Sequence, residues 1–168
     1  MKKVVATFLL PLLLSGCAGY HLGEAKPNYL RDIHSLAVPI FRNQTLLPRI
    51  EALITGTAIK QFQQDGTFRI TTEEKADAVL KGEIVAVTRS PARSVRGNVL
   101  ATTEFNLQMR VRYTLIGRDG AVLAGPSEVA GATSFFVGSD VNTDERQALP
   151  LAAQELATRL VSELSEGW

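Results

Sequence analysis

The chain has 168 residues, of which 45% are hydrophobic and 21% charged, and its formal net charge is +1. This length allows one hydrophobic core of useful size, and the apolar fraction excludes an intrinsically disordered chain. The near-zero charge offers no broad basic field for nucleic acid, and the single cysteine excludes an internal disulfide or a multi-thiolate metal site.

The first residues have the regions of an export signal in the usual order. Lys2 and Lys3 form a basic start, and residues 4–14 carry no charge. This uncharged run is too short to cross a bilayer, which requires about 20 apolar residues, but it fits a signal peptide. We therefore interpret residues 1–16 as a lipoprotein signal peptide. The alternatives are an ordinary secretory signal with a chance cysteine, or a buried N-terminal helix.

Cys17 follows Leu14-Ser15-Gly16, and this ending resembles the bacterial lipobox. The resemblance implies that Cys17 receives a diacylglycerol, becomes the first residue of the mature protein and is acylated there. Two or more acyl chains anchor a protein stably without a membrane-spanning segment. Ala18 stands where an aspartate favours retention in the inner membrane, so the resemblance implies the periplasmic side of the outer membrane. Residues 17–32 form the lipidated N-terminus and a tether.

A single domain is expected over residues 33–168. Ser35 to Phe41 is typical of a strand, in which Pro39 favours an edge position or a bulge. An amphipathic helix follows, with Pro48 in its first turn and Asp65-Gly66 as its stop. Extended structure is predicted again at residues 68–71 and 78–88, on either side of a polar turn at 72–75.

The clearest strand is Glu104 to Ile116, where apolar and polar residues alternate strictly. One face is apolar and consists of Phe105, Leu107, Met109, Val111, Tyr113 and Leu115. Such alternation indicates an antiparallel sheet that is covered on one side only. Asp119-Gly120 predicts a hairpin turn, and Val122 to Phe136 supplies the return strand, which Gly125, Pro126 and Gly131 weaken.

A C-terminal helix is predicted from one apolar stripe: Leu149, Ala153, Leu156, Leu160 and Leu164. Asn142, with Glu145 three residues later, resembles a helix N-cap with its partner, whereas Pro150 requires either a start near Leu149 or a kink. The order of elements predicts an α+β fold. We expect a mostly antiparallel sheet of four to five strands with two helices packed on one face, as a two-layer sandwich.

Patterns for catalysis or metal binding are missing from the sequence. His21 and His34 are the only histidines, and neither stands at metal-ligand spacing from a second ligand. There is no nucleophile elbow, phosphate loop or HExxH motif, and the adjacent Glu73 and Glu74 would point to opposite faces of a strand. We expect a protein that is not an enzyme and uses no cofactor, metal or nucleic acid.

Arginines are concentrated in the middle of the chain. Between Lys81 and Asp119, seven basic residues stand against three acidic ones, and six of the seven are arginine. A guanidinium group binds phosphate or carboxylate through two hydrogen bonds. The candidate residues for binding an anionic lipid head group are Arg93 and Arg96 in a flexible loop, and Arg110 and Arg112 on the open sheet face. The alternative is that these arginines only keep an exposed face and its strand ends soluble.

Several phrases of the sequence resemble a known family. Cys17-Ala18-Gly19-Tyr20-His21-Leu22 is similar to the opening of the lipopolysaccharide-assembly lipoproteins of the LptE family. Residues 36–45, 48–55 and 76–84 resemble the strand, first helix and "aspartate, then strand with glycine" segment of its broader, non-enterobacterial branch. The resemblance implies a sheet with two helices on one face and no cofactor. It also implies pairing with the outer-membrane β-barrel LptD as a plug, help in barrel assembly and binding of lipopolysaccharide.

A second resemblance leaves an alternative open. The strand followed by Phe41-Arg42-Asn43-Gln44-Thr45 and a helix also resembles the CsgG-like and LpoB-like outer-membrane lipoproteins. That resemblance implies a secretion-pore component or an activator of a peptidoglycan synthase. A synthase activator needs a tether that crosses the periplasm, and the segment from Ala18 to Asp32 extends to only about 50 Å.

Overall fold

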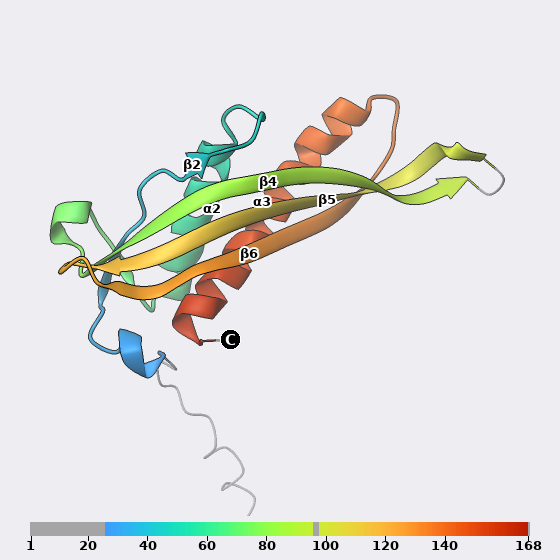
Figure 1. Ribbon diagram of the computed structural model, residues 1–168. Helices are drawn as coiled ribbons and strands as arrows, with labels where there is room; N and C mark the ends of the chain where they lie inside the picture. The colour runs from blue at the N-terminus through green and yellow to red at the C-terminus, as the bar shows by residue number, and fades with distance from the viewer. Residues whose placement is uncertain (1–25, 96–97, 168) are drawn as a thin grey trace, which may run out of the picture.

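The computed structural model describes residues 26–95 and 98–167 of the chain. Its sheet contains six strands: β1 (Ser35–Ala37), β2 (Arg42–Asn43), β3 (Arg69–Ile70), β4 (Ala78–Val95), β5 (Asn98–Gly117) and β6 (Val122–Phe136). Two α-helices, α2 (Ile50–Asp65) and α3 (Val141–Ser165), and two short 3₁₀ helices, η3 (Asn28–Leu30) and η4 (Glu73–Lys75), complete the described part. Both α-helices lie on the same side of the sheet (Figure 1). The predicted α+β class with two helices on one face is confirmed.

The sheet is mixed, with the strand order β3-β1-β4-β5-β6 and with β2 also paired to β4. The three long strands are antiparallel, as predicted, whereas β1, β2 and β3 pair in parallel. The strands predicted at residues 35–41 and 68–71 are thus present, but the prediction of four to five mostly antiparallel strands missed their parallel pairing and the separate strand β2. They are parallel because α2 forms the crossover between β1 and β3, as parallel pairing requires.

The strand predicted from Ser35 to Phe41 is divided in two. β1 ends at Ala37 and β2 begins at Arg42, and both pair with β4. Pro39 lies in the interruption, where its missing N–H breaks no ladder hydrogen bond. The packed core begins before residue 33, because Leu30 of η3 is completely buried.

Helix α2 begins later than the sequence predicts. Pro48 lies outside the helix, and Arg49 is its N-cap, with a φ of 67° in the left-handed region. The predicted stop is confirmed, because Gly66 adopts a φ of 79° and its N–H donates to the Phe62 carbonyl at 3.0 Å.

Helix α3 runs from Val141 to Ser165 with Pro150 inside it, so of the two predicted alternatives the start near Leu149 is wrong, and the helix begins well before the proline. The predicted N-cap is also wrong by two residues. Asp140 caps the helix, and its carboxylate accepts a hydrogen bond from the Asn142 N–H at 3.0 Å.

The core lies between the helices and the inner face of the sheet. Leu107, Met109 and Val111 of β5 are completely buried, as the alternation predicts. Helix α3 crosses β6 at Gly131, where an added Cβ atom would overlap the backbone nitrogen of Leu156. Gly131 is thus required for close helix–sheet contact and is more than a weak point of the strand.

The β4–β5 hairpin projects beyond the rest of the sheet (Figure 1). Strand β6 pairs with β5 only as far as the Glu104–Phe136 register position. Past that point, the hairpin is a two-stranded ribbon. Among the described residues, no helix is long and apolar enough to span a membrane.

Candidate functional site: the open face of the sheet

The face of the sheet opposite the helices is polar. Strand β5 presents Asn106, Gln108, Arg110 and Arg112 there, and all four are exposed. This face follows from the strict alternation of β5, because successive side chains in a strand point to opposite sides. The sequence-predicted Arg110 and Arg112 therefore lie together on the open face, as expected.

A row of alternating charges crosses this face. Arg42 of β2 pairs in register with Glu83 of β4, Glu83 with Arg112 of β5, and Arg112 with Glu128 of β6. Arg42 Nη1 lies 3.7 Å from Glu83 Oε1, and Arg112 Nη2 donates to Glu128 Oε1 at 2.7 Å. Exposed ion pairs of this kind contribute at most about 1 kcal/mol each, so the row defines the surface chemistry more than the stability. We call these four residues the charge row.

Arg110 shares the carboxylate at the end of the charge row. Its Nη1 lies 3.8 Å from Glu128 Oε2, while Arg112 contacts the other oxygen. Two guanidinium groups thus contact one carboxylate, so this part of the open face carries a net positive charge. Glu128 and Arg42 were missed at the sequence level. Only their register with β5 and β4 places them in the row.

Arg93 lies apart from Arg110 and Arg112. It belongs to β4, so the predicted flexible loop is wrong for this residue. Its Nε lies 3.7 Å from Glu104 Oε2, on the hairpin. Glu104 precedes Arg110 by six residues in β5, which corresponds to about 20 Å. Arg96 lies outside the described residues.

Arg89, another arginine of the segment between Lys81 and Asp119, has its contacts on the helix side of the sheet. It forms an ion pair with Glu145 of α3, and its guanidinium lies 5.0 Å from the centre of the Phe105 ring. It therefore does not contribute to the open face.

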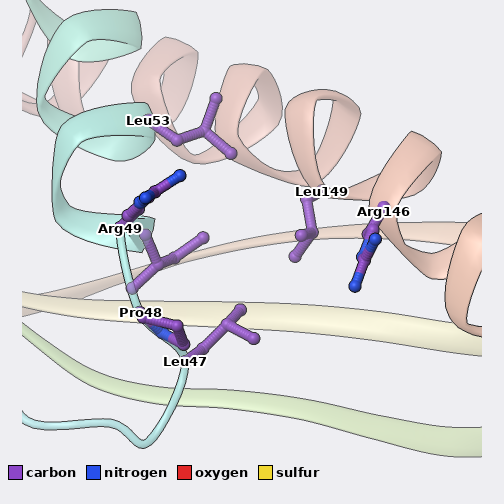
Figure 2. A pocket seen from close by; sticks show the side chains of 7 residues that line it. Leu47, Pro48, Arg49, Leu53, Arg146 and Leu149 are labelled. Atoms are coloured by element: carbon purple, nitrogen blue, oxygen red, sulfur yellow. The ribbon is translucent and has the colours of Figure 1, made fainter.

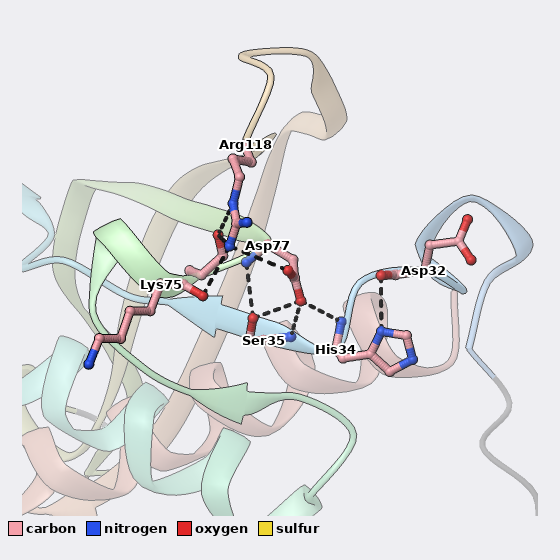
Figure 3. A network of polar contacts seen from close by, with 7 residues as sticks. Asp32, His34, Ser35, Lys75, Asp77 and Arg118 are labelled. Atoms are coloured by element: carbon pink, nitrogen blue, oxygen red, sulfur yellow. Dashed lines mark hydrogen bonds and ion pairs between the residues drawn. The ribbon is translucent and has the colours of Figure 1, made fainter.

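Arg118 belongs to a polar network around Asp77, the residue directly before β4 (Figure 3). Its guanidinium donates to the carbonyl oxygens of Lys75 and Ala76, and Nη2 lies 3.6 Å from Asp77 Oδ1. Asp77 Oδ2 accepts hydrogen bonds from the hydroxyl and N–H of Ser35, at 2.7 and 2.9 Å. The network ties β1 to β4 and is structural, because the Ser35 hydroxyl is buried and donates to a carboxylate.

The other candidate ligands are not assembled into a site. His34 Nδ1 lies 3.0 Å from the Asp32 carbonyl oxygen, and the described residues contain no group of three or more His, Cys, Asp and Glu that could hold a metal ion. Cys17 and His21 lie outside the described residues.

Comparison with known families gives one match. Residues 33–164 match the family model described as lipopolysaccharide-assembly, LptE. The match begins just before β1 and ends one residue before the end of α3. Among proteins of curated function, no sequence matches the chain significantly.

Several solved structures share the fold. A Xanthomonas campestris protein is 12% identical, with a TM-score of 0.56 over 80% of this chain and 85% of its own. A minor lipoprotein from Acinetobacter baumannii is 17% identical, with a TM-score of 0.51 over 80% of this chain and 92% of its own. A PelC dodecamer from Paraburkholderia phytofirmans, with one substitution in its chain, is 19% identical, with a TM-score of 0.50 over 79% of this chain and 89% of its own. At these identities, the similarity concerns the fold.

Proposed function

The chain belongs to the lipopolysaccharide-assembly family, LptE, and we propose that it is an outer-membrane lipoprotein, anchored through Cys17, that pairs with the LptD β-barrel. In this role it plugs the barrel, assists barrel assembly and helps to deliver lipopolysaccharide to the outer leaflet. The family match over residues 33–164 carries the proposal, because it covers nearly the whole folded domain. The role is binding, without catalysis.

The chemistry of the open face supports the plug role. The lumen of an outer-membrane barrel is polar, whereas its lipid-facing surface is apolar. The open face carries the charge row and the amide side chains of Asn106 and Gln108. Polar groups of this kind are costly to bury against acyl chains but form hydrogen bonds with a hydrated wall.

The same face supports contact with lipopolysaccharide. Arg110 and Arg112 share the single carboxylate of Glu128, and each is about half exposed. A phosphate group that binds here would supply further acceptor oxygens, and a guanidinium group can bind two of them through a pair of parallel hydrogen bonds. We propose that Arg110 and Arg112 meet phosphate on the open face, that Arg93 meets it on the hairpin, and that Arg96 is a further phosphate contact.

Site-specific photo-cross-linking in cells tests the pairing. A photoreactive amino acid at Gln108, on the open face, should capture a large β-barrel protein of the outer membrane. The same amino acid at Gln154, exposed on the outer side of α3, is the matched control and should give a weaker product. Capture of a peptidoglycan synthase, or only of further copies of this chain, would contradict the proposal and favour the alternative class of lipoprotein.

A further inference from the structure

A cavity of about 660 Å³ lies between the first turns of α2 and the first half of α3. Figure 2 shows Leu53 of α2 and Leu149 of α3 facing this space, with Leu47 and Pro48 on its other side. Ile50 completes the apolar part of the lining. The volume falls within the range of small-molecule sites in proteins.

Two arginines, Arg49 and Arg146, complete the lining. Within the described residues, neither guanidinium forms an ion pair with a carboxylate. The nearby acidic side chains are engaged elsewhere: Glu51 accepts from Asn43, Asp144 accepts from the Gly138 N–H, and Glu145 pairs with Arg89. The arginines of the open face, by contrast, are held by glutamates.

Asp140, the N-cap of α3, is also engaged. Its carboxylate accepts from the Thr143 hydroxyl at 2.6 Å and from the Asn142 N–H at 3.0 Å. The Thr143 hydroxyl is the largest cause that lowers the pKa of Asp140, and the charge of Arg146 is the smallest. The cavity therefore combines an apolar lining with two cations that lack a direct ion-pair partner.

Helix α2 adds to the positive potential of the cavity. The C-terminal ends of α2 and α3 meet, because the Ser165 hydroxyl donates to Asp65 Oδ1 at 2.9 Å, and their N-terminal parts meet at the cavity. The two helices thus run in the same direction. The cavity lies at the N-terminus of α2, the positive end of its dipole, and beside the second and third turns of α3, which Arg146 and Leu149 occupy. No side chain caps the N-terminus of α2, so its first N–H groups have no side-chain acceptor.

Arg49 adopts a strained conformation at this N-terminus. Its φ of 67° is uncommon for a residue with a side chain, and it is the one non-glycine residue with a positive φ in the described part of the chain. Strain of this kind is concentrated at ligand-binding positions.

We infer that this cavity binds one molecule of an anionic phospholipid, with its phosphate between Arg49 and Arg146 and an acyl chain along Leu47, Leu53 and Leu149. The phosphate supplies the acceptors that the two guanidinium groups and the α2 N-terminus lack. The acyl chain covers apolar side chains that are otherwise partly exposed to water.

The lining distinguishes a phospholipid from other anionic ligands. It contains no hydroxyl, amide, carboxylate or aromatic side chain that would recognise a sugar, as a glycolipid requires. It also offers no sheet edge to an extended peptide. The site lies away from the open face, on the helix side of the sheet, and goes beyond the proposed function without depending on it.

Cross-linking of the full lipidated chain in cells grown with radioactive phosphate tests this inference. A photoreactive amino acid at Leu53 or Leu149 should give a phosphorus-labelled adduct that is heavier than the chain by the mass of one phospholipid. The same amino acid at Leu151, exposed on α3 outside the cavity, is the matched control. Protease resistance equal to that of the unmodified chain establishes that each variant is folded.

A charge-matched pair of double variants tests the role of the arginines. Arg49→Gln with Arg146→Gln should reduce the labelled adduct about tenfold or more, because both phosphate partners are lost. Arg31→Gln with Arg69→Gln removes the same charge from exposed positions elsewhere and should leave the adduct unchanged. An adduct of lipopolysaccharide or protein, no adduct at either position, or equal labelling in both double variants would overturn the inference.

Discussion

Asp77 fixes the beginning of the sheet through a single carboxylate oxygen. Its Oδ2 accepts from the hydroxyl and N–H of buried Ser35 and from the His34 N–H, at 2.7 to 3.2 Å. The Ser35 hydroxyl is the largest cause that holds the pKa of Asp77 below its ordinary value; the N–H groups and Arg118 add to it. The sequence shows the aspartate but not its role, because Ser35 and Asp77 meet only when β1 pairs with β4.

Replacing Asp77 by alanine should lower the free energy of unfolding by about 2 kcal/mol, because buried donors of Ser35 lose their acceptor. Asp77→Asn should cost less, since its amide oxygen replaces Oδ2. The pKa of Asp77 is lowered in the folded state, so its charged form stabilises the protein above the ordinary pKa of 3.8. That contribution is lost as the pH falls through the lowered pKa.

Urea unfolding at neutral pH and in acid measures both effects. The wild-type chain should lose more stability in acid than Asp77→Asn does, because only the wild type has a carboxylate to protonate at this position. An alanine variant as stable as wild type at neutral pH, or an asparagine variant with the same acid dependence, would show that the network does not hold β1.

The arginines of the open face show how far residue-level prediction extends. The alternation of β5 correctly placed Arg110 and Arg112 on the exposed side. Their shared partner Glu128 depends on the cross-strand register with β6, which shifts between Tyr113 and Leu115. The alternation within a single strand does not predict which residues of two neighbouring strands lie opposite each other.

At the scale of elements, length and periodicity decided what was predictable. The long strands β5 and β6 and the glycine stop of α2 follow from clear local signals. Strand β3 lies within the predicted extended segment 68–71, whereas the two-residue strand β2 has no periodicity to detect and exists only because β4 pairs with it. Pro150 suggested an interruption, yet α3 continues because its stripe of buried residues packs on the sheet.

Two glycines on different elements give opposite predictions for the same substitution. Gly131→Ala should lower the free energy of unfolding by about 1–3 kcal/mol, because the new Cβ atom meets the backbone of α3 at Ala152 and Leu156. Gly56→Ala, inside α2 with no atom within 4 Å of the added Cβ, should raise it by up to about 1 kcal/mol.

Chemical denaturation of both variants provides the measurement, with Gly56→Ala as the matched control for Gly131→Ala. If Gly131→Ala were neutral or stabilising, α3 would not lie as close to β6 as the structure places it.

At the scale of the whole molecule, the two faces of the sheet differ in what covers them. The helices bury one face of the sheet and hold the cavity with Arg49 and Arg146 at their N-terminal ends. The other face carries the charge row, and the β4–β5 hairpin extends beyond both (Figure 1). This division suits a plug, in which a polar face and a projecting hairpin meet a hydrated lumen while the core stays covered.

Depletion of the protein tests the central claim most directly, through surface lipopolysaccharide and the assembly state of LptD measured in the same cells. Loss of a barrel partner that delivers lipopolysaccharide should reduce surface lipopolysaccharide and leave LptD misassembled. Expression of the full chain should restore both, and a chain with Cys17→Ala should restore them less because its anchor is lost. Normal surface lipopolysaccharide together with correctly assembled LptD in depleted cells would contradict the account.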